Sequence, residues 1–231
     1  CGKDKDAVIS ELGEHIYCNP AKNTGGRYSG WETAEEYLSG HVRTKLALAQ
    51  EAAKTDPEYE RNVTALLDNQ PPRIGIEDIG FRVGTIYIEP EMFQDFVYET
   101  FQTPEWQRHR PNMHGYSKEI TVNYSPEMNQ WKVTNSSGML DVLSTETYGT
   151  KRLNAYELTE LLLNQKRAVV NDYRELPDGR TERVFNAKET ILARECQDKI
   201  EQAFHDWVMA DKDRIQIIED RFNALFNNIK P

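Results

Sequence analysis

The chain has 231 residues, which is enough for one large domain or two small ones. Its formal net charge is -10, whereas a free-standing nucleic-acid-binding domain is usually basic, so this balance argues against DNA binding by the whole surface. A local basic stripe is still compatible with it. Hydrophobic residues make up 38% of the sequence, and its Trp, Phe and Tyr residues supply enough apolar area for at least one folded core.

The cysteines Cys1, Cys18 and Cys196 have no spacing typical of a metal site, and an odd number fits a reducing cytoplasm better than a disulfide framework. No run of about 18 apolar residues is present, so we expect no membrane partner and a cytoplasmic location. The chain starts at Cys1 instead of Met. Two explanations stay open: a fragment of a longer protein, or a mature bacterial lipoprotein with its lipid on Cys1.

The first 31 residues are rich in Gly, Asn, Lys and Asp, which predicts an irregular arm with a short strand at His15–Cys18. Capping-box spacings at Ser29 and Thr33 then begin a helix that runs to about Lys54, since apolar residues recur at steps of three and four. Gly40 lies inside this pattern and favours a break, because glycine costs about 1 kcal/mol relative to alanine within a helix.

The next segments read as two helices around a strand. One helix begins at Asp56-Pro57 and stops at Pro71-Pro72. The segment Arg82–Ile88 predicts a strand. Pro90 suits the first position of the second helix, which presents aromatic residues on one face and stops near Pro104.

Alternating apolar and polar residues predict a β-hairpin from Glu119–Tyr124 and Trp131–Thr134. A polar connection follows over Ser136–Thr147. The next helix starts at Asn154, whose side chain can accept a hydrogen bond from the first-turn amides, while Glu157 can reach back to the amide of Asn154.

A second hairpin, from Ala168–Arg174 and Arg183–Phe185, turns at Pro177-Asp178-Gly179. Two long helices with apolar stripes complete the chain, the first capped by Asn186, and we expect them to pair antiparallel. The elements together predict an α+β fold that is mostly helical, with two short β-hairpins and a C-terminal pair of long antiparallel helices.

These elements divide the chain into an irregular arm over residues 1–31, a helical part with one strand over 32–104, and a third part over 117–231. The third part holds the first hairpin, the helix, the second hairpin and the two long helices. Breaks near residue 72 and at 105–117 are the expected boundaries, and a single domain containing all three parts fits the same pattern.

The sequence has no motif for nucleotide phosphates, for dinucleotide binding or for a nucleophilic serine. His109 and His114 lie five residues apart in a predicted loop, and solvated histidines explain them better than a metal site does. Because no nucleophile–base pair or ligand cluster is visible, we expect no catalytic residue, no metal, no cofactor and no enzymatic activity in this chain.

Basic residues are in excess between residues 151 and 174, where the sequence contains five cations and three carboxylates. Ordinary surface charge is the simpler explanation, but such a patch could also hold phosphates, and a helix start adds backbone amides and a favourable dipole. The candidate nucleic-acid-binding residues are Lys151, Arg152, Asn154, Lys166 and Arg167, with Arg174 as a further cation of the patch.

Several stretches of the sequence resemble those of one protein family. The run Tyr37-Leu38-Ser39-Gly40-His41-Val42-Arg43-Thr44-Lys45-Leu46 resembles a Tyr-Leu-Ser-Gly-x-Val-Arg-x-Lys-Leu signature of very large proteins of phages, plasmids and conjugative elements. These proteins join an adenine-specific DNA methyltransferase to a superfamily-two helicase, and some look like antirestriction proteins. His41 departs from the Asn usual there. Further matching stretches follow in the family's order, among them Tyr148-Gly149-Thr150-x-Arg152-x-Asn154-Ala155, Phe185-Asn186-x-x-Glu189-Thr190 and Phe222-Asn223-x-x-Phe226-Asn227-x-Ile229.

The resemblance implies a place between the two catalytic regions, just before the helicase core begins. Neither catalytic motif set lies in this chain, so ATP and S-adenosylmethionine are implied only for the parent protein, and the flanking helicase and methyltransferase regions are implied partners. Three hypotheses follow. The chain is a non-catalytic linker that guides DNA into the helicase, or a purely structural scaffold that packs on the helicase, or a surface lipoprotein that begins at Cys1.

Overall fold

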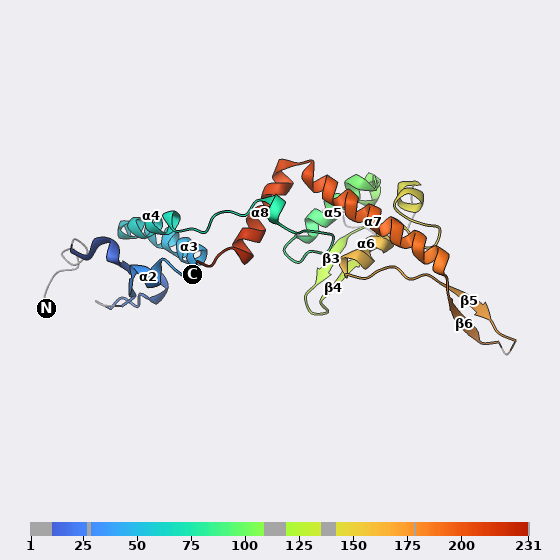
Figure 1. Ribbon diagram of the computed structural model, residues 1–231, viewed down its shortest axis with the longest axis horizontal. Helices are drawn as coiled ribbons and strands as arrows, with labels where there is room; N and C mark the ends of the chain where they lie inside the picture. The colour runs from blue at the N-terminus through green and yellow to red at the C-terminus, as the bar shows by residue number, and fades with distance from the viewer. Residues whose placement is uncertain (1–10, 27–28, 109–118, 135–141, 178, 231) are drawn as a thin grey trace. The chain divides into compact units, whose positions relative to one another are not determined.

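The computed structural model describes residues 11–26, 29–108, 119–134, 142–177 and 179–230. Helices alternate with three short antiparallel strand pairs (Figure 1), which confirms the predicted α+β class. One strand pair, near the start of the chain, adds to the two hairpins expected from the sequence. The expectations for Cys1, His109, His114 and Asp178 concern residues outside the described part of the chain.

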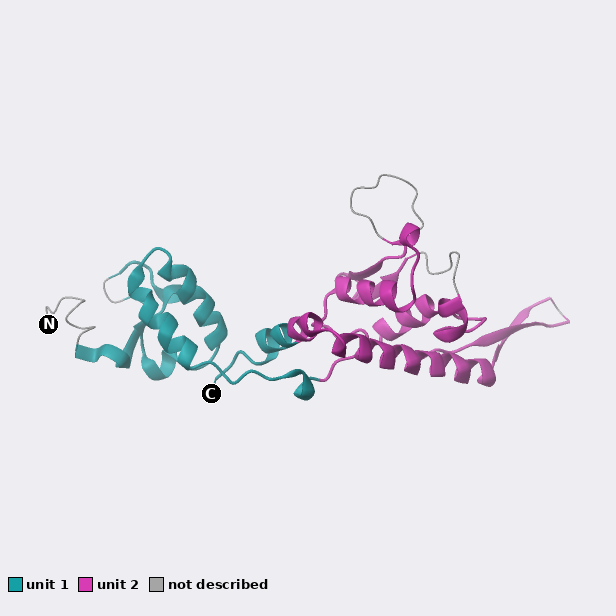
Figure 2. Cartoon of the chain, turned by 90° about the horizontal axis from the view of Figure 1, so that it is seen from above, with its two compact units in different colours: residues 1–79, 219–231 teal, residues 80–218 magenta. Residues whose placement is uncertain are grey.

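The chain forms two compact units (Figure 2). Unit 1 contains residues 1–79 and 219–231, and unit 2 contains residues 80–218. This division differs from the linear order of parts expected from the sequence, because the last residues of the chain belong with the first.

Unit 1 pairs two three-residue strands and packs short helices beside them. Strands β1 and β2 are antiparallel, with Tyr17 opposite Glu32. Tyr17 belongs to a buried core that also contains Tyr37, Val42, Ala49 and Leu66. The elements of unit 1 before its C-terminal segment are η1 (Gly13–His15), β1 (Ile16–Cys18), η2 (Pro20–Lys22), β2 (Trp31–Thr33), α2 (Ala34–Tyr37), α3 (Val42–Ala53), η3 (Pro57–Tyr59), α4 (Glu60–Asp68) and η4 (Ile76–Asp78).

The single helix expected as far as Lys54 is in fact two helices, α2 and α3. The capping box at Thr33 forms with Glu36, whereas the alternative spacing from Ser29 is unused because its partner position lies in β2. Gly40 separates the helices at a φ of 69°, in the left-handed region that glycine adopts without strain. Gly40 therefore lies between two helices and is not an interior residue of a single longer helix.

Unit 2 has helices around an aromatic core. The rings of Phe96 and Phe204 have centroids 5.1 Å apart, and Phe101 meets Tyr156 edge to face at 5.4 Å. Its elements are α5 (Pro90–Thr100), η5 (Glu105–Gln107), β3 (Val122–Ser125), β4 (Gln130–Val133), η6 (Leu143–Thr147), α6 (Ala155–Leu163), β5 (Asn171–Glu175), β6 (Thr181–Phe185), α7 (Ala187–Met209) and the first part of α8 (Lys212–Phe226).

The segment Arg82–Ile88 is not a strand, which corrects the sequence prediction. Two consecutive turns form it, with the amide of Thr85 donating to Arg82 O at 3.1 Å and the amide of Ile88 donating to Thr85 O at 3.1 Å. Gly84, at the third position of the first turn, has a φ of 82°. The turns bury Val83 and Ile88 and leave Ile86 exposed.

The two long C-terminal helices are present, but the structure changes the expected pairing. Helix α7 packs against α5 and α6, burying Ile200 and Phe204. The second half of α8 belongs to unit 1, where Asn223 binds the backbone of Ile74. The apolar stripe of α7 is therefore buried against α5 and α6, whereas Leu225 and Phe226 of α8 are exposed. A further difference is η6, a helical turn within the expected polar connection.

The loop before α6 passes very close to neighbouring backbone at Gly149. A Cβ on this residue would lie 2.9 Å from Ala155 N and 3.0 Å from Asn154 Cα, and it would overlap Ser144 O. Only a residue without a side chain fits there, although the backbone conformation of Gly149 is an ordinary one.

Replacing Gly149 with Ala should lower the free energy of unfolding of unit 2 by about 2 kcal/mol or more, because the backbone has to move to relieve the overlap. Chemical denaturation followed by circular dichroism measures the change. Gly80→Ala is the matched control, since a Cβ at Gly80 meets nothing within 4 Å. Equal stability of the two variants would contradict the proposed steric cause.

Candidate functional site

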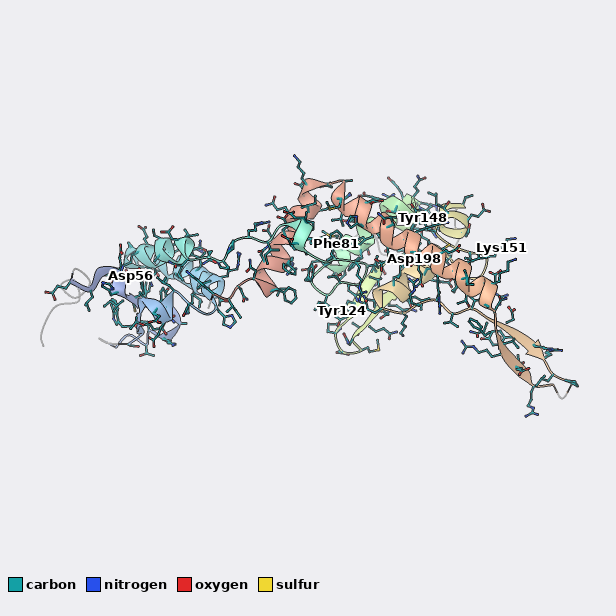
Figure 3. All side chains as sticks on the ribbon, viewed as in Figure 1. Asp56, Phe81, Tyr124, Tyr148, Lys151 and Asp198 are labelled. Atoms are coloured by element: carbon teal, nitrogen blue, oxygen red, sulfur yellow. The ribbon has the colours of Figure 1, made fainter. Side chains whose placement is uncertain are left out.

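The loop that carries Lys151 and Arg152 is held by its own backbone. Thr150 N donates to Leu153 O at 2.7 Å, and the Thr150 hydroxyl accepts from the amides of Arg152 and Leu153. Cys196 on α7 donates its thiol to Gly149 O at 3.4 Å. The loop is thus a fixed turn leading into α6 (Figure 3 labels Lys151 on it).

The start of α6 has the capping box predicted from the sequence. Asn154 Oδ1 accepts from the amide of Glu157 at 3.0 Å, and Glu157 Oε2 accepts from the amide of Asn154 at 2.9 Å. Asn154 is also buried. Because these groups satisfy each other, the helix start offers an anion fewer open amides than the phosphate-binding hypothesis requires.

Two of the four candidate cations are in ion pairs. Arg152 donates to Asp172 Oδ1 at 2.9 Å and to Asn171 O at 3.0 Å, at the beginning of β5. Arg167 donates to Asp198 Oδ1 on α7 at 2.7 Å. The side chains are about half exposed, so each pair stabilises the fold by only about 0–1 kcal/mol, but each offsets the local positive charge.

The structure divides the candidate residues between two places. Lys151 and Arg152 lie beside the base of β5, whereas Lys166 and Arg167 lead from α6 towards β5, with Arg167 bound to α7. Lys151 and Lys166 are exposed, and no ion pair is recorded for either within the described residues. The five candidates therefore do not converge through shared contacts on one pocket.

A carboxylate on α7 lies beside the Arg167 segment. Glu201 Oε2 accepts from the amide of Val83 at 3.1 Å. Burial raises the pKa of Glu201, against the opposing effects of the Val83 hydrogen bond and the charges of Arg82 and Arg167. Its charged form is therefore disfavoured in the folded state relative to the unfolded chain.

Sequence reasoning missed the contacts between the two ends of the chain in unit 1. Gly40 N donates to Lys230 O at 2.7 Å, and Lys230 N donates to Gly40 O at 2.9 Å. Arg43 Nε donates to Asn227 O at 2.7 Å, and Lys230 Nζ donates to Asn69 Oδ1 at 2.6 Å. We call these contacts, together with those of α8 to residues 72–76, the terminal clasp.

The polar stripe of α8 completes the terminal clasp. Asn223 is buried, accepts from Ile74 N at 2.9 Å and donates to Ile74 O at 2.9 Å. Arg73 binds both Glu219, at 2.9 Å, and Asp220, at 2.6 Å. The segment 72–76 is thereby tied to α8 by a side-chain amide and two carboxylates.

The Tyr37–Leu46 signature has structural roles in unit 1. Lys45 Nζ donates to the carbonyl oxygens of Glu36, Tyr37 and Ser39 at 2.7–3.0 Å, so its ammonium closes the end of α2. The Tyr37 hydroxyl accepts from Asn62 Nδ2 at 3.0 Å in the core. With Gly40 and Arg43 in the terminal clasp, the signature residues are accounted for by packing and hydrogen bonding.

Among its described residues, unit 1 has open cavities. One is lined by Lys22, Glu32, Glu36 and Lys45, but Lys22 is paired with Glu32 and Lys45 is engaged at the end of α2. Within the described residues, no group of three His, Cys, Asp or Glu side chains could hold a metal ion. Nor does that part of the chain contain a helix long and apolar enough to cross a membrane.

Comparison with known families gives one match. A family model described as a domain of unknown function, DUF8437, matches residues 82–228, which is more than half of the chain. The chain belongs to the DUF8437 family. No curated protein and no solved structure matches it significantly. The DUF8437 match covers nearly all of unit 2 and α8, and it begins after the Tyr37–Leu46 signature.

Replacing Asn223 with Ala should destabilise unit 1 by about 2–3 kcal/mol, because it leaves the backbone N–H and C=O of Ile74 without their partner. Hydrogen exchange at the Ile74 amide should quicken accordingly. Asn228→Ala is the control, since the Asn228 side chain makes a single solvent-exposed bond of 3.2 Å, to Ala224 O of α8. Equal loss in both variants would contradict the assigned role.

Replacing Glu201 with Gln tests the raised pKa. A carboxyl whose folded pKa lies above its unfolded value holds its proton better when folded, so its contribution to stability falls as pH rises through that window. Wild-type stability should therefore decline relative to Glu201→Gln as pH rises above the ordinary glutamate pKa of about 4. Thermal unfolding at a series of pH values measures this, and the opposite slope would refute it.

Proposed function

We propose that this DUF8437 chain is a non-catalytic scaffold that holds regions of a longer protein together. The observation that carries the proposal is the terminal clasp, in which Gly40 and Lys230 exchange both backbone hydrogen bonds. Residues separated by most of the chain are thereby fixed side by side, and unit 2 is an insertion between them. A fold closed in this way suits a module that sets the distance and orientation between the regions of the longer protein that flank it.

The resemblance to DNA methyltransferase–helicase proteins of mobile elements supports the same role. Two of the motifs that carry it contribute to the terminal clasp: the first supplies Gly40 and Arg43, and the last supplies Asn223 and Asn227. We infer that the flanking methyltransferase and helicase regions are the partners of the scaffold. ATP and S-adenosylmethionine then act in those regions, away from this chain.

Guidance of DNA is the second candidate, and the exposed ammonium groups of Lys151 and Lys166 favour it. Against it stand the ion pairs of Arg152 and Arg167 and the closed capping box of Asn154. A phosphate would have to displace Asp172 and Asp198 before it could gain either guanidinium. The scaffold is therefore the better-supported function.

A salt titration separates the two candidates. For a scaffold, labelled single-stranded, duplex and forked DNA should show no binding to the chain even at about 50 mM salt, where phosphate contacts are least screened. Fluorescence anisotropy measures binding, and calorimetry with the separately expressed flanking regions should detect their association with the chain.

The cation variants decide which surface is involved if DNA does bind. Binding that weakens with salt, and that is lost in Lys151→Ala/Arg152→Ala, would favour DNA guidance over the scaffold. The control is Lys199→Ala/Lys212→Ala, which removes the same charge from exposed positions on α7 and α8. Equal weakening by both double variants would indicate attraction by overall charge without a defined site.

A further inference from the structure

The β5–β6 hairpin projects from the helices of unit 2 (Figures 1 and 2). None of its ten strand residues is buried. Tyr173 is 72% exposed and Phe185 is 58% exposed, although the hairpin is otherwise mostly polar. An isolated two-stranded ribbon is marginally stable in water, so such a ribbon gains from additional strands.

The backbone of β5 has a defined free edge. Asn186 N donates to Val170 O at 3.0 Å, and Leu176 N donates to Arg180 O at 2.8 Å. Hydrogen-bonded pairs alternate along an antiparallel ladder, so the even-numbered residues of β5 point their backbone groups at β6. The N–H and C=O groups of Asn171, Tyr173 and Glu175 consequently point away from β6.

Arg152 covers only the base of this edge. Its guanidinium binds Asn171 O at 3.0 Å and leaves the backbone groups of Tyr173 and Glu175 without a recorded partner in the described part of the chain. The Arg152–Asp172 pair is about half exposed, so little free energy is needed to rearrange it. The central part of the edge is therefore open to another strand.

The sequence of β5 is complementary to itself in one antiparallel register. When two copies meet with Tyr173 opposite Tyr173, Arg174 of each lies opposite Asp172 of the other, and Asn171 lies opposite Glu175. The same register matches the backbone, because the outward groups of Tyr173 face each other as a hydrogen-bonded pair. Opposite charges facing each other across a ladder stabilise it.

We propose that β5 pairs edge to edge with β5 of a second copy of this chain, centred on Tyr173. The product is a four-stranded antiparallel sheet in the order β6-β5-β5-β6. This association goes beyond the scaffold role and does not depend on it. In the longer protein it would join two scaffolds through their unit 2 hairpins.

Other registers and other strands fit less well. Directly opposite residues share one face of a sheet, so a symmetric register must be centred on a residue. Centring β5 on Asp172 or Arg174 sets like charges opposite each other, and so does centring β6 on Glu182 or Arg183. Centring β6 on Val184 avoids this, but the overlap then ends where α7 begins.

The charge of the hairpin favours a second copy over nucleic acid. Residues 171–185 carry three arginines and four carboxylates, so a phosphate backbone would meet a slightly negative ribbon. A copy of β5 instead brings one cation and two anions into a register that pairs Arg174 with Asp172.

Sedimentation velocity of the 231-residue chain, from about 1 to about 200 μM, tests the proposal over the range expected for a small interface. The wild type should show a concentration-dependent dimer. Tyr173→Pro should abolish it, because proline removes an outward N–H at the centre of the interface. Arg183→Pro is the matched control, since it removes an outward N–H from the other edge of the same hairpin and should keep the dimer.

Charge variants test the register. Arg174→Gln should raise the dimer dissociation constant about fivefold, because two symmetric Arg174–Asp172 pairs are lost. Arg183→Gln, with the same change on β6, should leave it within about twofold. A wild type that stays monomeric throughout overturns the proposal. So does a dimer that survives Tyr173→Pro, one that Arg183→Pro abolishes equally, or one equally sensitive to both Gln variants.

Discussion

The hydrogen bonds of Asn223 with Ile74 are the interaction on which the organisation of unit 1 depends. One buried amide satisfies both backbone groups of a residue in a segment that has little regular structure of its own. With Arg73 bound to Glu219 and Asp220, and Gly40 paired with Lys230, it makes α8 and the chain end part of the first unit. Neither a catalytic group nor a ligand is needed to explain this arrangement.

The charged groups of the described residues also have mainly structural roles. Arg152 and Arg167 read in the sequence as part of a basic patch, yet each binds a carboxylate, and Lys45 closes a helix. In this chain of net charge -10 the carboxylates outnumber the cations, and Arg73 and Arg214 are paired with carboxylates as well. Local counts of charge therefore overstate the positive potential available to a phosphate, which is why the scaffold fits this structure better than a DNA guide.

Unit 2 combines well-packed helices with the β5–β6 hairpin, which is not buried. Phe96, Phe204 and their neighbours fill the space between α5 and α7, whereas no residue of β5 or β6 reaches a core. Edge strands usually carry some device against pairing with other chains. In β5 that device is Arg152, which protects only the first residue, and this explains how one chain can be both locally stable and able to associate.

The sequence by itself determined the features that depend on short-range physics. The capping boxes at Thr33 and Asn154, the proline that opens α5 and the two hairpins lie where the residue types predict them, because their partners are only a few positions away. The strand expected at Arg82–Ile88 was wrong for a related reason. Contacts to Val83 from Glu201 and Gln165, both distant in the sequence, hold this segment as two turns.

Only the tertiary structure decided the features that join distant residues. Arg152 meets Asp172 across 20 positions, Arg167 meets Asp198 across 31, and Ile74 meets Asn223 across 149. No local pattern encodes such a pairing, because propensity and periodicity act over one or two turns of chain. Which cations are neutralised, and which ends of the chain meet, thus follow from the packing of whole elements.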